Sequence, residues 1–187
     1  MADNYLEKKY EEFQARKNGA GKKKTNSIHK MRRVFVTGGA DGIGKTIVKA
    51  FRMAGNRVAF CDTNEVLGKE TAEKTGTTFY HADIYDKEAL DNCMRHSLQE
   101  WGDLDILINN AGTIGYSPIT ESSVEDFERI LSVNLRSTFL TSRLLAIHRQ
   151  SQATPNPYGR IINICSPRNQ NESGNEGYAA SRGGIYS

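Results

Sequence analysis

Residues 34–44, which read VFVTGGADGIG, decide the fold of this chain. An apolar, β-branched run ends at Thr37, and four closely spaced glycines follow it: Gly38, Gly39, Gly42 and Gly44. The pattern predicts a buried strand that turns sharply into a helix. Glycines permit such a turn and leave room for a phosphate group to approach the amides of the helix N-terminus. The stretch therefore predicts a phosphate-binding turn; a glycine-rich turn with a purely structural role is the alternative.

The alternation that begins there continues along the rest of the chain. Five runs with four to six apolar or β-branched residues begin at Arg32, Arg57, Thr77, Asp105 and Gly159. We expect these runs to form strands that are buried on both faces. Four amphipathic segments lie between them, at residues 42–54, 64–74, 87–101 and 123–149. Because strands and helices alternate strictly, the sequence predicts an α/β fold: a doubly wound parallel sheet of five strands with helices on both faces.

The composition is typical of a soluble globular protein. The 187 residues are 37% hydrophobic and 25% charged, which suffices for one domain of ordinary size with an appendage. No run reaches the roughly 18 apolar residues of a membrane span, and the N-terminus is charged where a signal peptide is apolar. We therefore expect a cytoplasmic protein without a membrane partner. Because Cys61, Cys93 and Cys165 lack paired spacing, we expect small buried side chains and neither a disulfide framework nor a metal site.

The basic charge of the chain is concentrated at its N-terminus. Residues 1–33 carry ten Lys or Arg against four Asp or Glu, whereas the remainder is acidic. Three apolar residues recur there at helical spacing: Leu6, Tyr10 and Phe13. We predict that residues 1–31 form a basic tail with a short amphipathic helix, and that residues 32–187 form a dinucleotide-binding domain. For Lys22–Lys24, a solvated linker is favoured over binding of nucleic acid.

A carboxylate follows the second apolar run. Asp62 lies 24 residues beyond Gly38, and in dinucleotide-binding folds a carboxylate at about this separation accepts hydrogen bonds from the adenosine ribose. Asp41 and Asp62 would repel the 2′-phosphate of NADP, and no basic residue stands at either position. The two aspartates therefore predict NAD as the cofactor. The alternative for Asp62 is a helix-capping role.

Together, these motifs resemble those of the classical short-chain dehydrogenase/reductases, from Arg33 to the C-terminal end. The T-G-x-x-x-G-x-G turn of that family matches Thr37–Gly44, and its N-N-A-G motif matches Asn109–Gly112. The resemblance implies a Rossmann-like fold in which the residues at the end of the third strand hold the adenine. It also implies a set of cofactor-binding residues: Gly38, Asp41, Gly42, Ile43, Gly44, Asp62, Asp83, Ile84, Asn110, Ala111, Gly112, Tyr178 and Arg182.

The same resemblance implies four catalytic residues. Asn134 matches the asparagine that maintains a water-linked proton path in the family, with helix capping as the alternative. Ser166 would hydrogen-bond the substrate oxygen, and Tyr178 would transfer its proton to or from that oxygen. The Y-x-x-x-K motif of the family reads Tyr178 to Arg182 here, so an arginine replaces the lysine. Arg182 keeps a positive charge four residues from the tyrosine, but as a rigid, planar fork instead of a compact ammonium group.

The function that the resemblance implies is NAD-dependent interconversion of a small-molecule alcohol and a carbonyl compound by hydride transfer. Only nine residues follow Tyr178, whereas family members continue with two more strands. We therefore expect a C-terminally truncated scaffold whose activity is impaired, and a catalytically inactive dinucleotide-binding protein is the alternative. The fifth strand would then be an unpaired apolar edge, which predicts a homo-oligomer. The identity of the substrate is not specified by the sequence.

Overall fold

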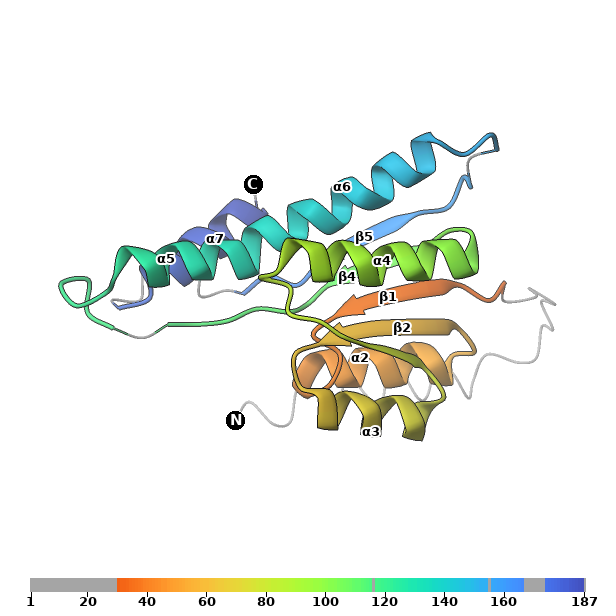
Figure 1. The fold of residues 1–187 in the computed structure, drawn as a ribbon, viewed down its shortest axis with the longest axis horizontal. Coiled ribbons are helices and arrows are strands. Elements are labelled where there is room, and N and C mark those ends of the chain that lie inside the picture. Colours follow the sequence, from red (N-terminus) through yellow and green to blue (C-terminus); the bar gives the residue numbers. More distant parts are fainter. Residues whose placement is uncertain (1–29, 116, 155, 167–173, 187) are drawn as a thin grey trace, which may run out of the picture. The chain divides into compact units, whose positions relative to one another are not determined.

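A parallel sheet of five strands lies at the centre of the computed structural model, which describes residues 30–115, 117–154, 156–166 and 174–186. The strand order is β3-β2-β1-β4-β5, and Figure 1 labels β2, β1, β4 and β5. The strands are β1 (Arg33–Thr37), β2 (Arg57–Asp62), β3 (Thr78–His81), β4 (Ile106–Asn109) and β5 (Arg160–Asn163). Because the order reverses at β1, the predicted doubly wound parallel sheet is confirmed. The predicted tail helix lies outside the described residues.

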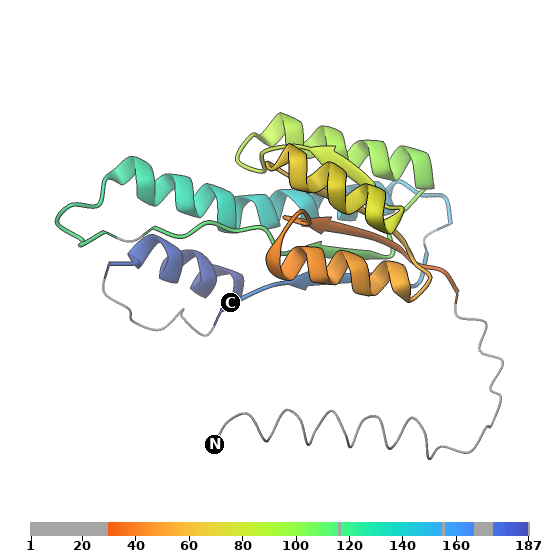
Figure 2. The same ribbon diagram turned by 90° about the horizontal axis from the view of Figure 1, so that it is seen from below.

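The helices cover both faces of this sheet. They are α2 (Gly42–Met53), α3 (Glu65–Thr75), α4 (Lys87–Trp101), α5 (Val124–Leu131), the π-helix η1 (Ser132–Arg136), α6 (Ser137–Gln150) and α7 (Glu176–Tyr186). Residues of α2 and α3 pack on one face, and residues of α4 and α6 pack on the other. Both ribbon views show α7 alongside α5 (Figures 1 and 2). In the described part of the chain, no helix has the length and apolar character needed to cross a membrane.

Side-chain alternation along β1 divides the core into two halves. Val34 and Val36 face α2 and α3, whereas Phe35 faces α4 and α6, and all three are fully buried. Burial on both faces is confirmed in the same way for β2 and β4. It is wrong for the two strands at the ends of the sheet: no residue of β3 is fully buried, and in β5 Ile161 and Ile162 are 45% and 41% exposed. The expected apolar edge is therefore present.

Two further predictions need correction. The segment 123–149 is not one α-helix, because η1 interrupts it: the N–H of Ser137 bonds to the carbonyl of Ser132, five residues earlier. Such π-helical turns often occur at functional sites. Of the three cysteines, Cys165 is exposed and not buried, because it follows the exposed edge strand.

A buried ionic cluster joins the amino ends of β1 and β4. Arg33 donates to Asp105 Oδ2 from its backbone N–H at 2.8 Å and from Nε at 3.0 Å. Asn156 Nδ2 donates to Asp105 Oδ1 at 2.8 Å, and the Asp105 side chain is only 2% exposed. Burial alone would raise the pKa of the Asp105 carboxyl, but these hydrogen bonds hold it below its usual value. The cluster keeps the two central strands in register at the edge remote from the carboxyl ends.

Candidate functional site

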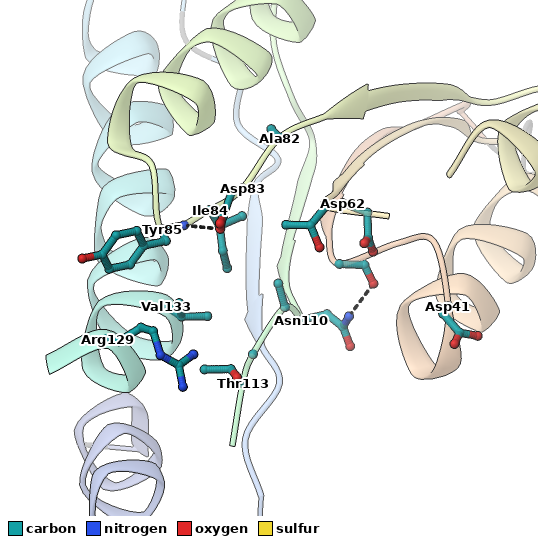
Figure 3. A pocket seen from close by; sticks show the side chains of 14 residues that line it. Asp41, Asp62, Ala82, Asp83, Ile84, Tyr85, Asn110, Thr113, Arg129 and Val133 are labelled. Atoms are coloured by element: carbon teal, nitrogen blue, oxygen red, sulfur yellow. Dashed lines mark hydrogen bonds between the residues drawn. The ribbon is translucent and has the colours of Figure 1, made fainter. Parts of the chain in front are cut away.

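A pocket of about 550 Å³ opens at the carboxyl ends of the strands, beside the point where the strand order reverses. Ligands of doubly wound sheets bind in this crevice. The pocket is formed by the loops that follow β1 to β4 and by one face of α5 and η1 (Figure 3). Its lining residues are Gly38, Asp41, Asp62, Thr63, Ala82, Asp83, Ile84, Tyr85, Asn110, Ala111, Gly112, Thr113, Arg129 and Val133.

The turn between β1 and α2 forms the part of the pocket nearest the sheet centre. Gly38 has a φ of +69°, and a Cβ on Gly44 would lie 1.8 Å from the Gly38 carbonyl oxygen, so both positions require glycine. The Asp41 carboxylate caps α2 by accepting from the N–H of Gly42 at 2.7 Å. The turn therefore brings the start of α2 close to the cavity. Backbone N–H groups at a helix start bind anions well.

The carboxylate of Asp62 connects the end of β2 to this turn. Its Oδ2 accepts from Ala40 N at 2.9 Å, and its Oδ1 accepts from Asn64 N at 3.0 Å. The side chain that caps α3 is Asn64, which accepts from the N–H of Leu67. Each carboxylate oxygen has a second lone pair that is available to a ligand. Two backbone N–H groups thus fix the orientation of the Asp62 carboxylate, which lines the pocket.

Asn110 joins the loop after β4 to the first turn. Its Nδ2 donates to the carbonyl oxygens of Thr37 at 3.1 Å and Gly38 at 2.9 Å. In return, the hydroxyl of Thr37 accepts from the N–H groups of Asn110 and Ala111 at 3.1 Å each. These bonds hold two segments that are more than 70 residues apart in the sequence as one rigid floor of the pocket.

The loop after β3 forms the opposite wall. Asp83 Oδ1 accepts from the N–H of Tyr85 at 2.9 Å, and Ile84 is buried between them. From η1, Arg136 Nη2 donates to the carbonyl of Tyr85 at 2.7 Å, and its guanidinium lies 5.4 Å from the centre of the tyrosine ring. The loop that carries Asp83 is therefore fixed by a hydrogen bond within the loop and by a second one from Arg136 of η1.

Asn134 lies behind the pocket wall and is fully buried. Its amide pairs with both backbone groups of Thr113, and its Nδ2 also donates to Ser181 Oγ of α7 at 2.9 Å. The side chain bonds across to other segments and not to a helix end, which does not favour the capping alternative. The predicted catalytic role of Asn134 stays a prediction.

Of the remaining predicted catalytic residues, Tyr178 and Arg182 belong to α7, and Ser166 follows β5. The Arg182 guanidinium is 5.0 Å from the centre of the Tyr178 ring, and its Nη1 donates to the carbonyl of Ile164 at 2.9 Å. The Nη2 group packs against Gly112, where an added Cβ would approach it to 2.2 Å. Arg182 therefore stands directly behind the pocket lining. Ser166 is partly buried just beyond β5.

The predicted cofactor residues thus fall into three groups. Eight of them line the pocket together: Gly38, Asp41, Asp62, Asp83, Ile84, Asn110, Ala111 and Gly112. Gly42, Ile43 and Gly44 belong to the start of α2 without lining the cavity, and Ile43 is 66% exposed. Tyr178 and Arg182 do not line it either.

Sequence reasoning missed six lining residues: Thr63, Ala82, Tyr85, Thr113, Arg129 and Val133. The first four adjoin predicted residues in the sequence, so extending each motif by one residue would have included them. Arg129 and Val133 are four residues apart on the helix that carries Asn134, which places them on one helical face. Helical spacing alone does not show that this face lines a pocket.

Comparisons with known proteins agree with this geometry. The family model described as short chain dehydrogenase matches residues 32–187. An uncharacterized oxidoreductase of Thermotoga maritima is 34% identical over 156 residues, which are 80% of this chain and 59% of that protein. The L-fucose dehydrogenase of Mus musculus is 36% identical over 138 residues, which are 71% of this chain and 48% of that protein.

The solved structures that match have the same fold. A short-chain dehydrogenase/reductase from Serratia marcescens has a TM-score of 0.75 at 33% identity, covering 82% of this chain and 64% of that one. A short chain dehydrogenase from Mycobacterium smegmatis has a TM-score of 0.76 at 26% identity, covering 83% of this chain and 66% of that one. The chain spans about half to three fifths of the length of the two sequence relatives.

Proposed function

Because the chain belongs to the short-chain dehydrogenase family, we propose that it binds NAD and interconverts an alcohol and a carbonyl compound by hydride transfer. The observation that carries the NAD assignment is the position of Asp62, whose carboxylate lines the pocket at the end of β2. Its two oxygens are oriented by the N–H groups of Ala40 and Asn64, and each can still accept a hydrogen bond from a ribose hydroxyl.

The rest of the pocket fits a dinucleotide. Gly38 leaves the backbone accessible beside the start of α2, where a pyrophosphate would meet N–H donors and the positive end of the helix dipole. The buried side chain of Ile84 and the carboxylate of Asp83 offer an apolar surface and a hydrogen-bond acceptor for a purine. A volume of about 550 Å³ is in the range of cofactor sites.

Charge supports NAD over NADP. Asp62 and Asp41 both line the pocket on the side of β1 and β2, where a 2′-phosphate would meet like charge. Within the described lining, the cationic side chain is Arg129, on α5 and across the cavity from Asp62 (Figure 3). Among the residues that line the pocket, a phosphate on the ribose would therefore have no cationic partner beside Asp62.

For the chemical step, we assign the family roles to the residues near α7. When bound, the nicotinamide ring supplies the hydride chemistry. Tyr178 would exchange a proton with the substrate oxygen, which Ser166 would hold by a hydrogen bond. Arg182 contributes positive charge beside the Tyr178 ring. Asn134 would keep Thr113 and α7 in place through its three hydrogen bonds.

A catalytically inactive dinucleotide-binding protein is the second candidate. It is favoured by the engagement of Arg182, whose guanidinium contacts the Ile164 carbonyl and Gly112 and does not line the cavity. A lysine at this position would be a compact, mobile charge. Monitoring the absorbance of reduced cofactor over a panel of alcohols and ketones separates the two candidates, because only the enzyme shows turnover.

Calorimetric titration with NAD and NADP tests the cofactor assignment. We expect NAD to bind at least tenfold more tightly, since a 2′-phosphate adds repulsion and no compensating contact near Asp62. Equal affinity for the two cofactors would contradict the NAD assignment, and failure of both to bind would contradict the proposed function.

We also propose that the chain self-associates through β5. Its residues are exposed, and within the described part of the chain it pairs only with β4. An apolar strand with one unpaired edge favours pairing with a second chain. Sedimentation velocity should show a species larger than a monomer at micromolar concentration, and a stable monomer would contradict this proposal.

A further inference from the structure

We propose that Arg129 is a specificity-determining residue, whose guanidinium contacts the purine base of the nucleotide in the pocket. The inference rests on the proposed binding of a dinucleotide. It adds to that function a residue that no sequence motif identified and that belongs to none of the loops after the strands.

The position of Arg129 on the helix directs it into the cavity. Arg129 and Val133 lie four residues apart, on one face of α5 and η1, and both line the pocket. In the close-up view, the Arg129 side chain extends into the cavity towards Thr113, whereas Asp41 and Asp62 lie on the far side (Figure 3).

The chemistry of the opposite side decides which part of a nucleotide reaches Arg129. Phosphates are expected at the start of α2 beside Gly38, and a ribose is expected at Asp62. A base attached to that ribose must extend away from α2, into the space bounded by Ile84 and Val133. Arg129 lies one helical turn from Val133 on the same wall of the pocket, so we expect its partner to be the base and not a phosphate.

The guanidinium is available for such a contact. Its Nε lies 3.5 Å from Asp126 Oδ1, and the two side chains are 45% and 59% exposed. A surface ion pair of this kind contributes little and is easily exchanged. Among the described residues, no hydrogen-bond partner of the Arg129 Nη groups is present, so ligand atoms can take these donors.

The donor and acceptor pattern suits adenine. A guanidinium has only donors and can bond to ring nitrogens or stack on the ring. The carboxylate of Asp83, on another wall of the same pocket, has only acceptors and can take the exocyclic amino group. Adenine carries both an amino donor and ring-nitrogen acceptors. The pair would therefore recognise this base from two sides.

The test uses the whole chain and three probes: adenosine, ADP-ribose and inorganic pyrophosphate. Affinities are measured by calorimetry, with displacement of NAD for the weak ligands, for the unmodified protein and three variants. Arg129→Ala removes the guanidinium, and Arg129→Gln keeps donors without the charge. Arg143→Ala is the matched control, because it removes an equal charge from an exposed position on α6 outside the pocket.

We expect Arg129→Ala to lower the affinities for adenosine and ADP-ribose by the same factor, about fivefold for one lost hydrogen bond. The affinity for pyrophosphate should not change. Arg129→Gln should lose less affinity for adenosine and ADP-ribose than Arg129→Ala does, and Arg143→Ala should bind all three probes as the unmodified chain does. Unfolding temperatures within about 2 °C of the unmodified chain would show that the exposed substitution leaves the fold intact.

Two results would overturn the inference while leaving the proposed function intact. Unchanged affinity for adenosine and ADP-ribose would mean that Arg129 faces solvent or the adjoining cavity of about 160 Å³ that it also lines. A loss confined to ADP-ribose and pyrophosphate, which shrinks in high salt, would mean a phosphate contact. If the unmodified chain binds neither ADP-ribose nor NAD, the proposed function itself fails, and the inference fails with it.

Discussion

The side-chain amide of Asn134 pairs with the backbone of Thr113 in both directions: Oδ1 accepts from Thr113 N at 2.8 Å, and Nδ2 donates to Thr113 O at 2.9 Å. The pair joins η1 to the loop after β4, and Thr113 lines the pocket. Because Asn134 also donates to Ser181, one buried side chain connects the pocket wall to two helical segments.

Replacement of this amide should therefore cost stability and cofactor affinity together. Asn134→Ala leaves the N–H and C=O of Thr113 without their partner, so the free energy of unfolding should fall by about 2–4 kcal/mol. Urea unfolding measures the loss. The matched control is Thr138→Ala, because among the described residues the Thr138 hydroxyl donates only to the carbonyl of Asn134, four residues earlier in the adjoining η1. Equal losses for the two variants would argue against this role of Asn134.

Removal of the Asp62 carboxylate should change cofactor preference. Asp62→Ala loses the acceptors proposed for the ribose and the charge proposed to exclude a 2′-phosphate. NAD affinity should fall about tenfold or more, while NADP affinity should fall less, so the ratio of the two dissociation constants moves towards one. Calorimetry measures both constants. Asp91→Ala, which changes a half-buried aspartate on α4 outside the pocket, should leave the ratio unchanged.

A methyl group at Gly44 should disrupt the β1–α2 turn. Its Cβ would lie 1.8 Å from the Gly38 carbonyl oxygen, which belongs to the rigid backbone. We expect Gly44→Ala to lose NAD binding and at least about 3 kcal/mol of stability. Gly183→Ala, in α7, meets no atom within 4 Å and should be neutral or slightly stabilising. Retained NAD binding by Gly44→Ala would contradict the geometry of the turn.

Gly112 and Arg182 should be energetically coupled. An added Cβ at residue 112 would come within 2.2 Å of Arg182 Nη2. Gly112→Ala should therefore destabilise the unmodified chain more than it destabilises the Arg182→Lys variant, whose shorter side chain leaves room. A double-mutant cycle by thermal unfolding should give a coupling energy of about 1–2 kcal/mol. Additive effects would mean that the two residues do not restrict each other.

Acid should weaken the cluster at Asp105. The folded state holds the pKa of this carboxyl below its usual value, so its contribution is complete above the unfolded pKa of about 3.9 and is lost as pH falls through the folded pKa. Asp105→Asn should cost about 2 kcal/mol at pH 7 and should flatten the decline in unfolding free energy below pH 4.

Local sequence patterns were sufficient to place the five strands and most of the helices, though not the π-helix η1, and they identified eight of the residues that line the pocket. The VFVTGGADGIG turn and the alternation of apolar and amphipathic segments depend on residues close together in the chain, and such periodicity predicts secondary structure. The parallel sheet follows because alternating strands and helices have few ways to pack. The expected roles of the motif residues in catalysis and cofactor binding remain predictions.

Tertiary packing decided the features that join distant segments. The pairing of Asn134 with Thr113 spans 21 residues, and the contacts of Arg182 with Ile164 and Gly112 bring three segments together. The same packing places Arg129 in the pocket and leaves β5 exposed. Helical or strand periodicity shows which residues share a face but not what lies opposite that face, because this depends on how separate elements pack in three dimensions.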